Sequence, residues 1–197
     1  GLLYMDFYPR ASKQGGAWMT SYRSQKTENG KRKAPVISIV CNFSKPSGNT
    51  PALLTFDEVT TFFHEFGHAL HGLLSNVQYQ SLAGTSVPRD FVELPSQVME
   101  NWATEPTVMK QYAFHYQTGE VIPDELIAKL TKSGTFGQGF GTTEYLAASL
   151  MDLDYHTQSE DITMDAGSFE KASMDKIGLI DEIIPRYRSP YFQHIFA

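Results

Sequence analysis

The segment His64-Glu65-Phe66-Gly67-His68 places two histidines and a glutamate at the spacing H-E-x-x-H. On a helix, residues four apart share a face, so both imidazoles can reach one tetrahedral Zn²⁺ at about 2.0–2.1 Å. Glu65 can reach a water that the metal activates without binding the metal itself. It would take a proton from that water as it attacks a carbonyl and return the proton to the leaving amine. The motif therefore predicts a hydrolytic zinc site, with His64 and His68 as ligands and Glu65 as general base.

A third ligand must come from outside this motif. Cys41 is the only cysteine, so a closed site built on several thiolates is excluded, and a catalytic zinc keeps one position for water. The candidates that follow the motif are Glu93, Glu100, His115 and Asp90. We favour Glu93 because its neighbours are apolar enough to face inward, and Pro95 then places it in a first helical turn or just before a kink. Two imidazoles and one carboxylate favour zinc over manganese or cobalt, with one ion per chain.

Other polar residues can support the site or have structural roles. Glu100 and Gln97 lie seven and four residues after Glu93, at spacings that return to the same helical face, so either can orient a ligand imidazole through its second nitrogen. His71 is either such a supporting group or a histidine that packs against another helix or faces solvent. Arg186 and Arg188 either hold a substrate carboxylate or form structural ion pairs. We expect structural roles for four further residues, namely His115, His156, Trp18 and Trp102.

The H-E-x-x-H motif lies within a helix predicted to run from Thr55 to about Ser75. Glu58 follows Thr55 by three residues, which is the spacing of a capping box, and apolar residues then recur at helical intervals. Strands are predicted at 2–8, 17–22 and 36–43, and a turn-rich connector at 44–52. The run at 36–43 is either an edge strand that pairs with an extended peptide or an ordinary buried strand. Cys41 within it is expected to be a small buried hydrophobe and not a reactive thiol.

Further helices are predicted over 91–105, 108–117, 124–132, 142–157 and 167–184, the last stopped by Pro185. The segment 134–141 contains four glycines, each of which costs a helix interior about 1 kcal/mol, so we predict a mobile loop that can act as a lid over peptide. The fold class is therefore mainly α, with a small β-sheet element before the motif helix. The cluster Lys31-Arg32-Lys33 is expected to be a solvated turn.

Composition limits the possible partners. The 197 residues are 41% hydrophobic and 19% charged, with a net charge of -6, so the chain can bury a sizeable core. The negative charge argues against binding to nucleic acid or to anionic membranes. No apolar stretch approaches the roughly 20 residues that span a bilayer. We expect a cytoplasmic monomer. Because both ends look cut, the whole of 1–197 is expected to be part of a longer protein.

The motif and its surroundings resemble a known family. His64 to His71 (H-E-F-G-H-A-L-H), 91–97 (F-V-E-L-P-S-Q) and 100–102 (E-N-W) are similar to the thimet oligopeptidase family of zinc metallopeptidases. Within that family, 6–8, 15–19, 185–189, 191–192 and 194–196 look closest to the bacterial dipeptidyl carboxypeptidases, or peptidyl-dipeptidases.

This resemblance implies a mostly helical, two-lobed, zincin-like enzyme with a deep channel, of which 1–197 would be a central part of the catalytic domain. It implies that His64, His68 and Glu93 bind zinc, that Glu65 is the general base, and that His194 hydrogen-bonds bound substrate. Substrates would be short peptides, and the expected reaction is release of C-terminal dipeptides. Two alternatives stay open: an endo-acting oligopeptidase of the same family, or, for these residues alone, a catalytically weak module that binds metal or peptide.

Overall fold

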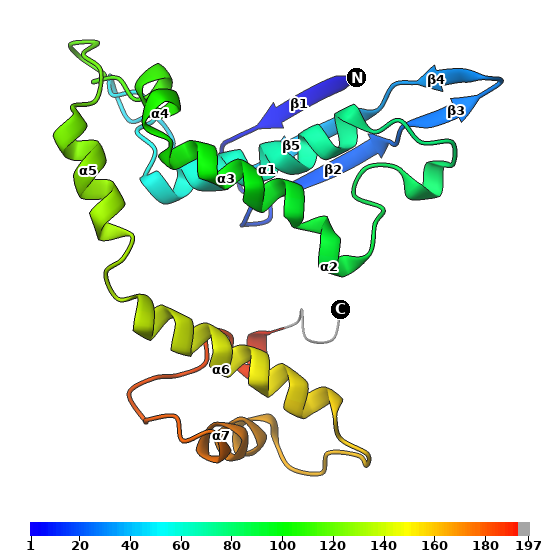
Figure 1. The fold of residues 1–197 in the computed structure, drawn as a ribbon, viewed down its shortest axis with the longest axis vertical. Helices are drawn as coiled ribbons and strands as arrows, with labels where there is room; N and C mark the ends of the chain where they lie inside the picture. Colours follow the sequence, from blue (N-terminus) through cyan, green and yellow to red (C-terminus); the bar gives the residue numbers. More distant parts are fainter. Residues whose placement is uncertain (193–197) are drawn as a thin grey trace. The chain divides into compact units, whose positions relative to one another are not determined.

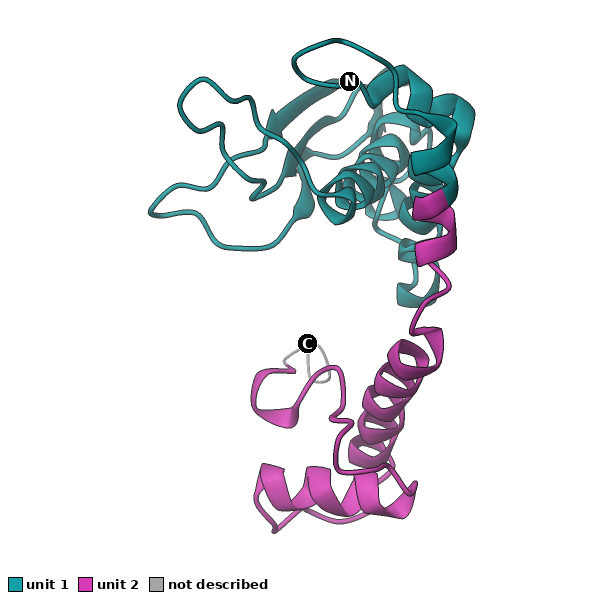
Figure 2. Cartoon of the chain, turned by 90° about the vertical axis from the view of Figure 1, so that its left-hand side faces the viewer, with its two compact units in different colours: residues 1–128 teal, residues 129–197 magenta. Residues whose placement is uncertain are grey.

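The computed structural model describes residues 1–192. The chain divides into two compact units, residues 1–128 and residues 129–197, and the boundary falls within helix α5 (Asp124–Ser133) (Figure 2). Helices account for most of the regular structure and the strands are short and few (Figure 1). The prediction of a mainly α chain with a small sheet is confirmed.

A three-stranded sheet opens unit 1. Its strands are β1 (Leu2–Asp6), β2 (Trp18–Arg23) and β5 (Val36–Val40), in the spatial order β1-β5-β2. β1 runs parallel to β5, and β2 runs antiparallel to it. The predicted strands are therefore present, but β5 is the central strand. The expectation that 36–43 forms an edge strand was wrong, and the alternative of a buried strand is confirmed.

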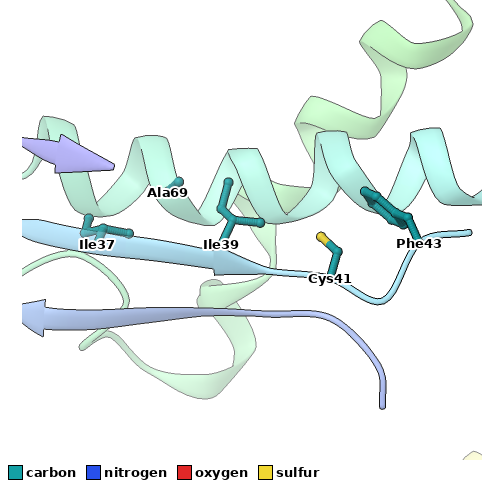
Figure 3. Close-up of a cluster of buried hydrophobic side chains, with 5 residues drawn as sticks. All are labelled: Ile37, Ile39, Cys41, Phe43 and Ala69. Carbon is teal, nitrogen blue, oxygen red and sulfur yellow. The ribbon is translucent and has the colours of Figure 1, made fainter. Parts of the chain in front are cut away.

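Helix α1 (Phe56–Leu74) covers one face of this sheet. Alternate side chains of β5 and its continuation point towards α1, because successive residues of a strand face opposite sides (Figure 3). The buried cluster consists of Ile37, Ile39, Cys41, Phe43 and Ala69. Cys41 is fully buried, and burial, followed by the nearby Glu65 carboxylate, raises the pKa of its thiol to about 11. The expectation of a small buried hydrophobe in place of a reactive thiol is thereby supported.

After α1, a 3₁₀ turn (Gln80–Leu82) leads to helices α2 (Arg89–Val92), α3 (Leu94–Thr104) and α4 (Pro106–Tyr112). The single helix predicted over 91–105 is thus broken at Glu93, because Pro95 lacks the N–H that would continue α2. The helix predicted over 108–117 ends at Tyr112. The chain there turns back, with Phe114 and Val121 bridged and Gly119 at φ 73°.

Unit 1 also contains a β-hairpin, which consists of β3 (Lys26–Glu28) and β4 (Lys31–Lys33). Asn29 and Gly30 have positive φ at its tip. The basic cluster at 31–33 is solvent-exposed, as predicted, but it forms a strand and not a turn. Among residues 1–192, no helix is both long and apolar enough to cross a membrane.

Unit 2 is built on α6 (Gln138–His156) and α7 (Ala166–Lys176), followed by a 3₁₀ turn (Ser189–Tyr191). Met151 and Met174 pack together in its core. Two predictions were wrong here. α6 begins at Gln138, so half of the expected loop at 134–141 is helical. α7 ends at Lys176 and not near 184, because Gly178 adopts φ 69° and Leu179 N–H returns to the carbonyl of Met174, which closes the helix.

Candidate active site

Helix α1 sets the geometry of the H-E-x-x-H motif. Its predicted capping box is present: Glu58 N–H donates to Thr55 Oγ1 at 3.2 Å, and Thr55 N–H donates to a Glu58 carboxylate oxygen at 2.8 Å. The helix then continues without a break through the motif. His64 and His68 therefore stand one turn apart on one face, with ring centroids separated by 4.9 Å.

Gly67 brings a second helix to the motif. A Cβ at Gly67 would lie 2.6 Å from both the carbonyl oxygen of Pro95 and the Cα of Ser96. Backbone atoms cannot rotate away as a side chain can, so only glycine allows α3 to approach α1 this closely. The glycine of the motif thus places the first turn of α3, and Glu93 immediately before it, beside the two histidines.

Three potential ligand atoms converge at this contact. Glu93 Oε2 lies 3.2 Å from His64 Nε2 and 3.1 Å from His68 Nε2, and all three ligand atoms lie within 4.8 Å of one another. Ligands bonded at about 2.0–2.1 Å around a tetrahedral Zn²⁺ are about 3.3 Å apart, so these separations suit that ion. Two imidazole nitrogens and one carboxylate are also a donor set that catalytic zinc uses. The predicted group of His64, His68 and Glu93 therefore fits a zinc ion.

The outer nitrogen of His64 has its own partner. Glu100 Oε1 lies 2.6 Å from His64 Nδ1. This contact fixes the ring and leaves Nε2 facing Glu93, an arrangement common in metal sites. Glu100 thus takes the supporting position and not that of the third ligand. Neither of the other two candidates, His115 and Asp90, belongs to the group that converges among residues 1–192.

Glu65 lies beside the histidines with a buried carboxylate. Glu65 is 5% exposed, and its Oε2 has no hydrogen-bond partner among the described residues. Burial raises its pKa above the ordinary value, the Glu93 charge acts in the same direction, and the His64 charge opposes them. A carboxyl group whose pKa is shifted towards neutrality can both accept and return a proton. This is the property required of the predicted general base.

The histidines differ in environment. Burial lowers the pKa of His68, although the Glu93 charge acts in the opposite direction. The lowered pKa favours the neutral imidazole that a metal requires. Burial also lowers the pKa of His71, and its ring lies 6.2 Å from that of Phe91 in an edge-on contact. His71 is outside the converging group. Its contacts suit the packing role that we weighed for it.

An open pocket of about 320 Å³ gives access to the group. Its walls combine the motif and Glu93 with residues from β2, α2 and the loops, namely Ala17, Trp18, Met19, Thr85 and Val92. We expected Trp18 to be purely structural, so its position in this wall was missed. The sequence offers no spacing signal that could have found it, because the contact depends on how the sheet packs on α1.

Residues predicted near the end of the chain have other outcomes. Arg188 donates to a carboxylate oxygen of Glu170 at 2.7 Å, so the structural ion pair that we considered for it is present. Arg186 lies over the ring of Tyr187. His194, the predicted substrate-binding histidine, lies outside the described residues.

The chain is similar to known proteins over its full length. The pattern of "Peptidase family M3" matches residues 1–197. Two proteins named dipeptidyl carboxypeptidase, from Escherichia coli K12 and Salmonella typhimurium LT2, are 48% and 46% identical over the whole chain. Oligopeptidase A of Escherichia coli K12 is 38% identical, also over the whole chain. The chain spans 29% of the length of each of these relatives. The chain belongs to peptidase family M3.

Proposed function

We propose that the protein carrying this chain is a zinc-dependent peptidase that removes dipeptides from the C-terminus of short peptides. The observation that carries the proposal is the convergence of His64, His68 and Glu93, with the buried Glu65 carboxylate beside them. Membership of a peptidase family supports it independently. The motif helix packed against a small sheet supports a zincin-like core.

The residues of this chain divide the chemistry between them. His64, His68 and Glu93 hold the metal, which when bound acts as a Lewis acid towards the scissile carbonyl and lowers the pKa of water. Glu65 accepts the proton of the attacking water and transfers it to the leaving amine. Glu100 keeps the His64 ring in place through Nδ1.

The pocket wall suggests how a peptide lies at the site. β2 is an edge strand among the described residues, and its first residues, Trp18 and Met19, line the pocket. An extended peptide can pair its backbone with such an edge, whatever its side chains, which suits an enzyme that accepts varied sequences. β2 therefore takes the role that we had considered for the run at 36–43.

Dipeptide release is favoured over internal cleavage by the names of the relatives. The two dipeptidyl carboxypeptidases are 46–48% identical to this chain, whereas oligopeptidase A is 38% identical. A short peptide with a free C-terminal carboxylate and the same peptide as its C-terminal amide distinguish the two modes in the whole protein. We expect rapid loss of a dipeptide from the free acid alone. Equal cleavage of both would favour the oligopeptidase mode.

The substitution Glu65→Gln tests the chemistry itself. It removes the base but none of the three metal-binding side chains. We expect hydrolysis to fall by about 10²–10⁴ while zinc content is unchanged. Retention of full activity by this variant would contradict the proposed role of Glu65, and loss of zinc would mean that Glu65 holds the metal.

A further inference from the structure

Ser96 is a fully buried polar residue next to the proposed metal site. It is 0% exposed and lies in the first turn of α3, where its Cα faces Gly67 of the motif. A buried hydroxyl requires a hydrogen-bond partner, because burying it without one costs about 1–3 kcal/mol. The choice of partner therefore indicates what Ser96 does.

Two oxygens of Glu93 are within reach of the Ser96 hydroxyl. Ser96 Oγ lies 2.8 Å from Glu93 Oε2 and 2.9 Å from the main-chain oxygen of Glu93. A serine hydroxyl has a single hydrogen to donate. The main-chain oxygen already accepts the N–H of Gln97 at 2.9 Å. The carboxylate is the stronger acceptor because it is charged.

The same carboxylate oxygen faces both histidines. Glu93 Oε2 is the atom that lies 3.2 Å from His64 Nε2 and 3.1 Å from His68 Nε2. The Glu93 side chain is otherwise 49% exposed, and its several rotatable bonds would let it move into solvent. Because Ser96 is buried and held rigidly, its hydroxyl limits the movement of Glu93 Oε2, the oxygen that faces both histidines.

We propose that Ser96 is a positioning residue for metal binding: its hydroxyl holds Glu93 Oε2 between the two histidines. The inference rests on the proposed zinc site and adds a residue that acts through Glu93 and does not bind the metal. The proposal also gives the Gly67 contact a function. The close approach of α3 to α1 places the Ser96 hydroxyl, and the Glu93 carboxylate that it contacts, beside the two histidines.

Zinc affinity of the 197-residue chain, measured by competition with a chelator of known affinity, tests the proposal. We expect Ser96→Ala to weaken zinc binding by about 10-fold or more, the usual effect of removing a group that orients a metal ligand.

Ser173→Ala is a matched control. Ser173 is also buried and also donates to a carboxylate, Asp154, at 2.7 Å, but it belongs to unit 2. We expect this variant to lose stability without losing zinc affinity. If both alanine variants weaken zinc binding equally, the effect is general destabilisation and the inference is overturned.

Cobalt substitution supplies a readout that stability does not affect. The visible spectrum of bound Co²⁺ depends on the geometry of its ligands, so we expect it to change in Ser96→Ala and to match the parent in Ser173→Ala. A zinc-binding parent with unchanged affinity and spectrum in Ser96→Ala overturns this inference alone. A parent that binds no zinc overturns the proposed site and the inference together.

Discussion

Helices α1 and α6 have the same length, 19 residues, and both contain glycines, yet these glycines have opposite surroundings. In α1, a Cβ at Gly67 would collide with the backbone of α3, and one at Gly72 would meet the side chain of Ile37. In α6, a Cβ at Gly139 or Gly141 would meet nothing within 4 Å among the described residues.

The difference shows that glycines in helices can have two distinct structural roles. In α1 it is required by close packing and so helps to form the metal site. In α6 it lowers helix propensity with no packing contact to compensate. Helix propensity alone predicted a loop for the glycines at the start of α6, and that prediction was wrong for Gly139 and Gly141.

Among the variants that test this difference, Gly67→Ala is expected to have the largest effect. Overpacking against the α3 backbone costs about 3 kcal/mol and the gain in helix propensity returns about 1 kcal/mol, so we expect a net loss of about 2 kcal/mol. Zinc affinity should also fall, because the added methyl would push α3 away from α1 and move Glu93 away from the histidines. Urea denaturation without metal and chelator competition measure the two effects separately.

Gly72→Ala is the control for that variant. Its new methyl would meet Cδ1 of Ile37, the far end of a side chain that can rotate. We expect a smaller loss of stability and unchanged zinc affinity. If the two variants behave alike, the backbone contact at Gly67 has no special role in forming the site.

Glu100→Gln is expected to have the next largest effect. The amide retains the shape of the side chain but replaces the charged acceptor that His64 Nδ1 contacts at 2.6 Å. We expect about a 10-fold loss of zinc affinity, or about 1.4 kcal/mol, with little change in the stability of the metal-free chain. Unaltered affinity would show that Glu100 does not help to orient His64.

Asp154→Asn tests the side chains that join α6 to α7. Hydrogen bonds from Lys176 and Ser173 hold the pKa of Asp154 below its ordinary value. A depressed pKa means that the contact stabilises the fold above the ordinary aspartate pKa of about 3.9 and ceases to do so as the pH falls through the folded value. We expect the variant to lose about 1 kcal/mol at pH 6 and to match the parent near pH 2. A constant difference between these two pH values, measured by urea denaturation, would contradict this explanation.

The smallest expected effect has the opposite sign. Gly139→Ala and Gly141→Ala should each stabilise unit 2 by up to about 1 kcal/mol, because alanine favours a helix and has space there. Thermal unfolding followed by circular dichroism measures this effect. Destabilisation by either variant would mean that these glycines are needed for contacts beyond those of α6 itself.

The sequence predicted the site better than the elements around it. Spacing alone placed His64 and His68 on one face of a capped helix, and Glu93 was chosen correctly as the residue that meets them. Their role as zinc ligands stays a prediction. Trp18 and Ser96 were missed because their positions depend on tertiary packing, which has no periodic signal.

Helix ends were the weakest predictions. The end of α7 could have been predicted, since Gly178 lies where a closing glycine is common. Pro95 indicated a helix start or a kink near Glu93. The prediction of one continuous helix over 91–105 did not include that break. The central position of β5 could not be predicted, because strand order is decided by long-range pairing and not by local pattern.

Metal content is the most direct test of the proposed site. The chain, purified without added metal, should contain about one zinc by elemental analysis, and the His68→Ala and Glu93→Ala variants should each lose it. A parent chain without zinc, or zinc retained in both variants, would contradict the account. Zinc retained only in the Glu93 variant would show that another residue completes the site.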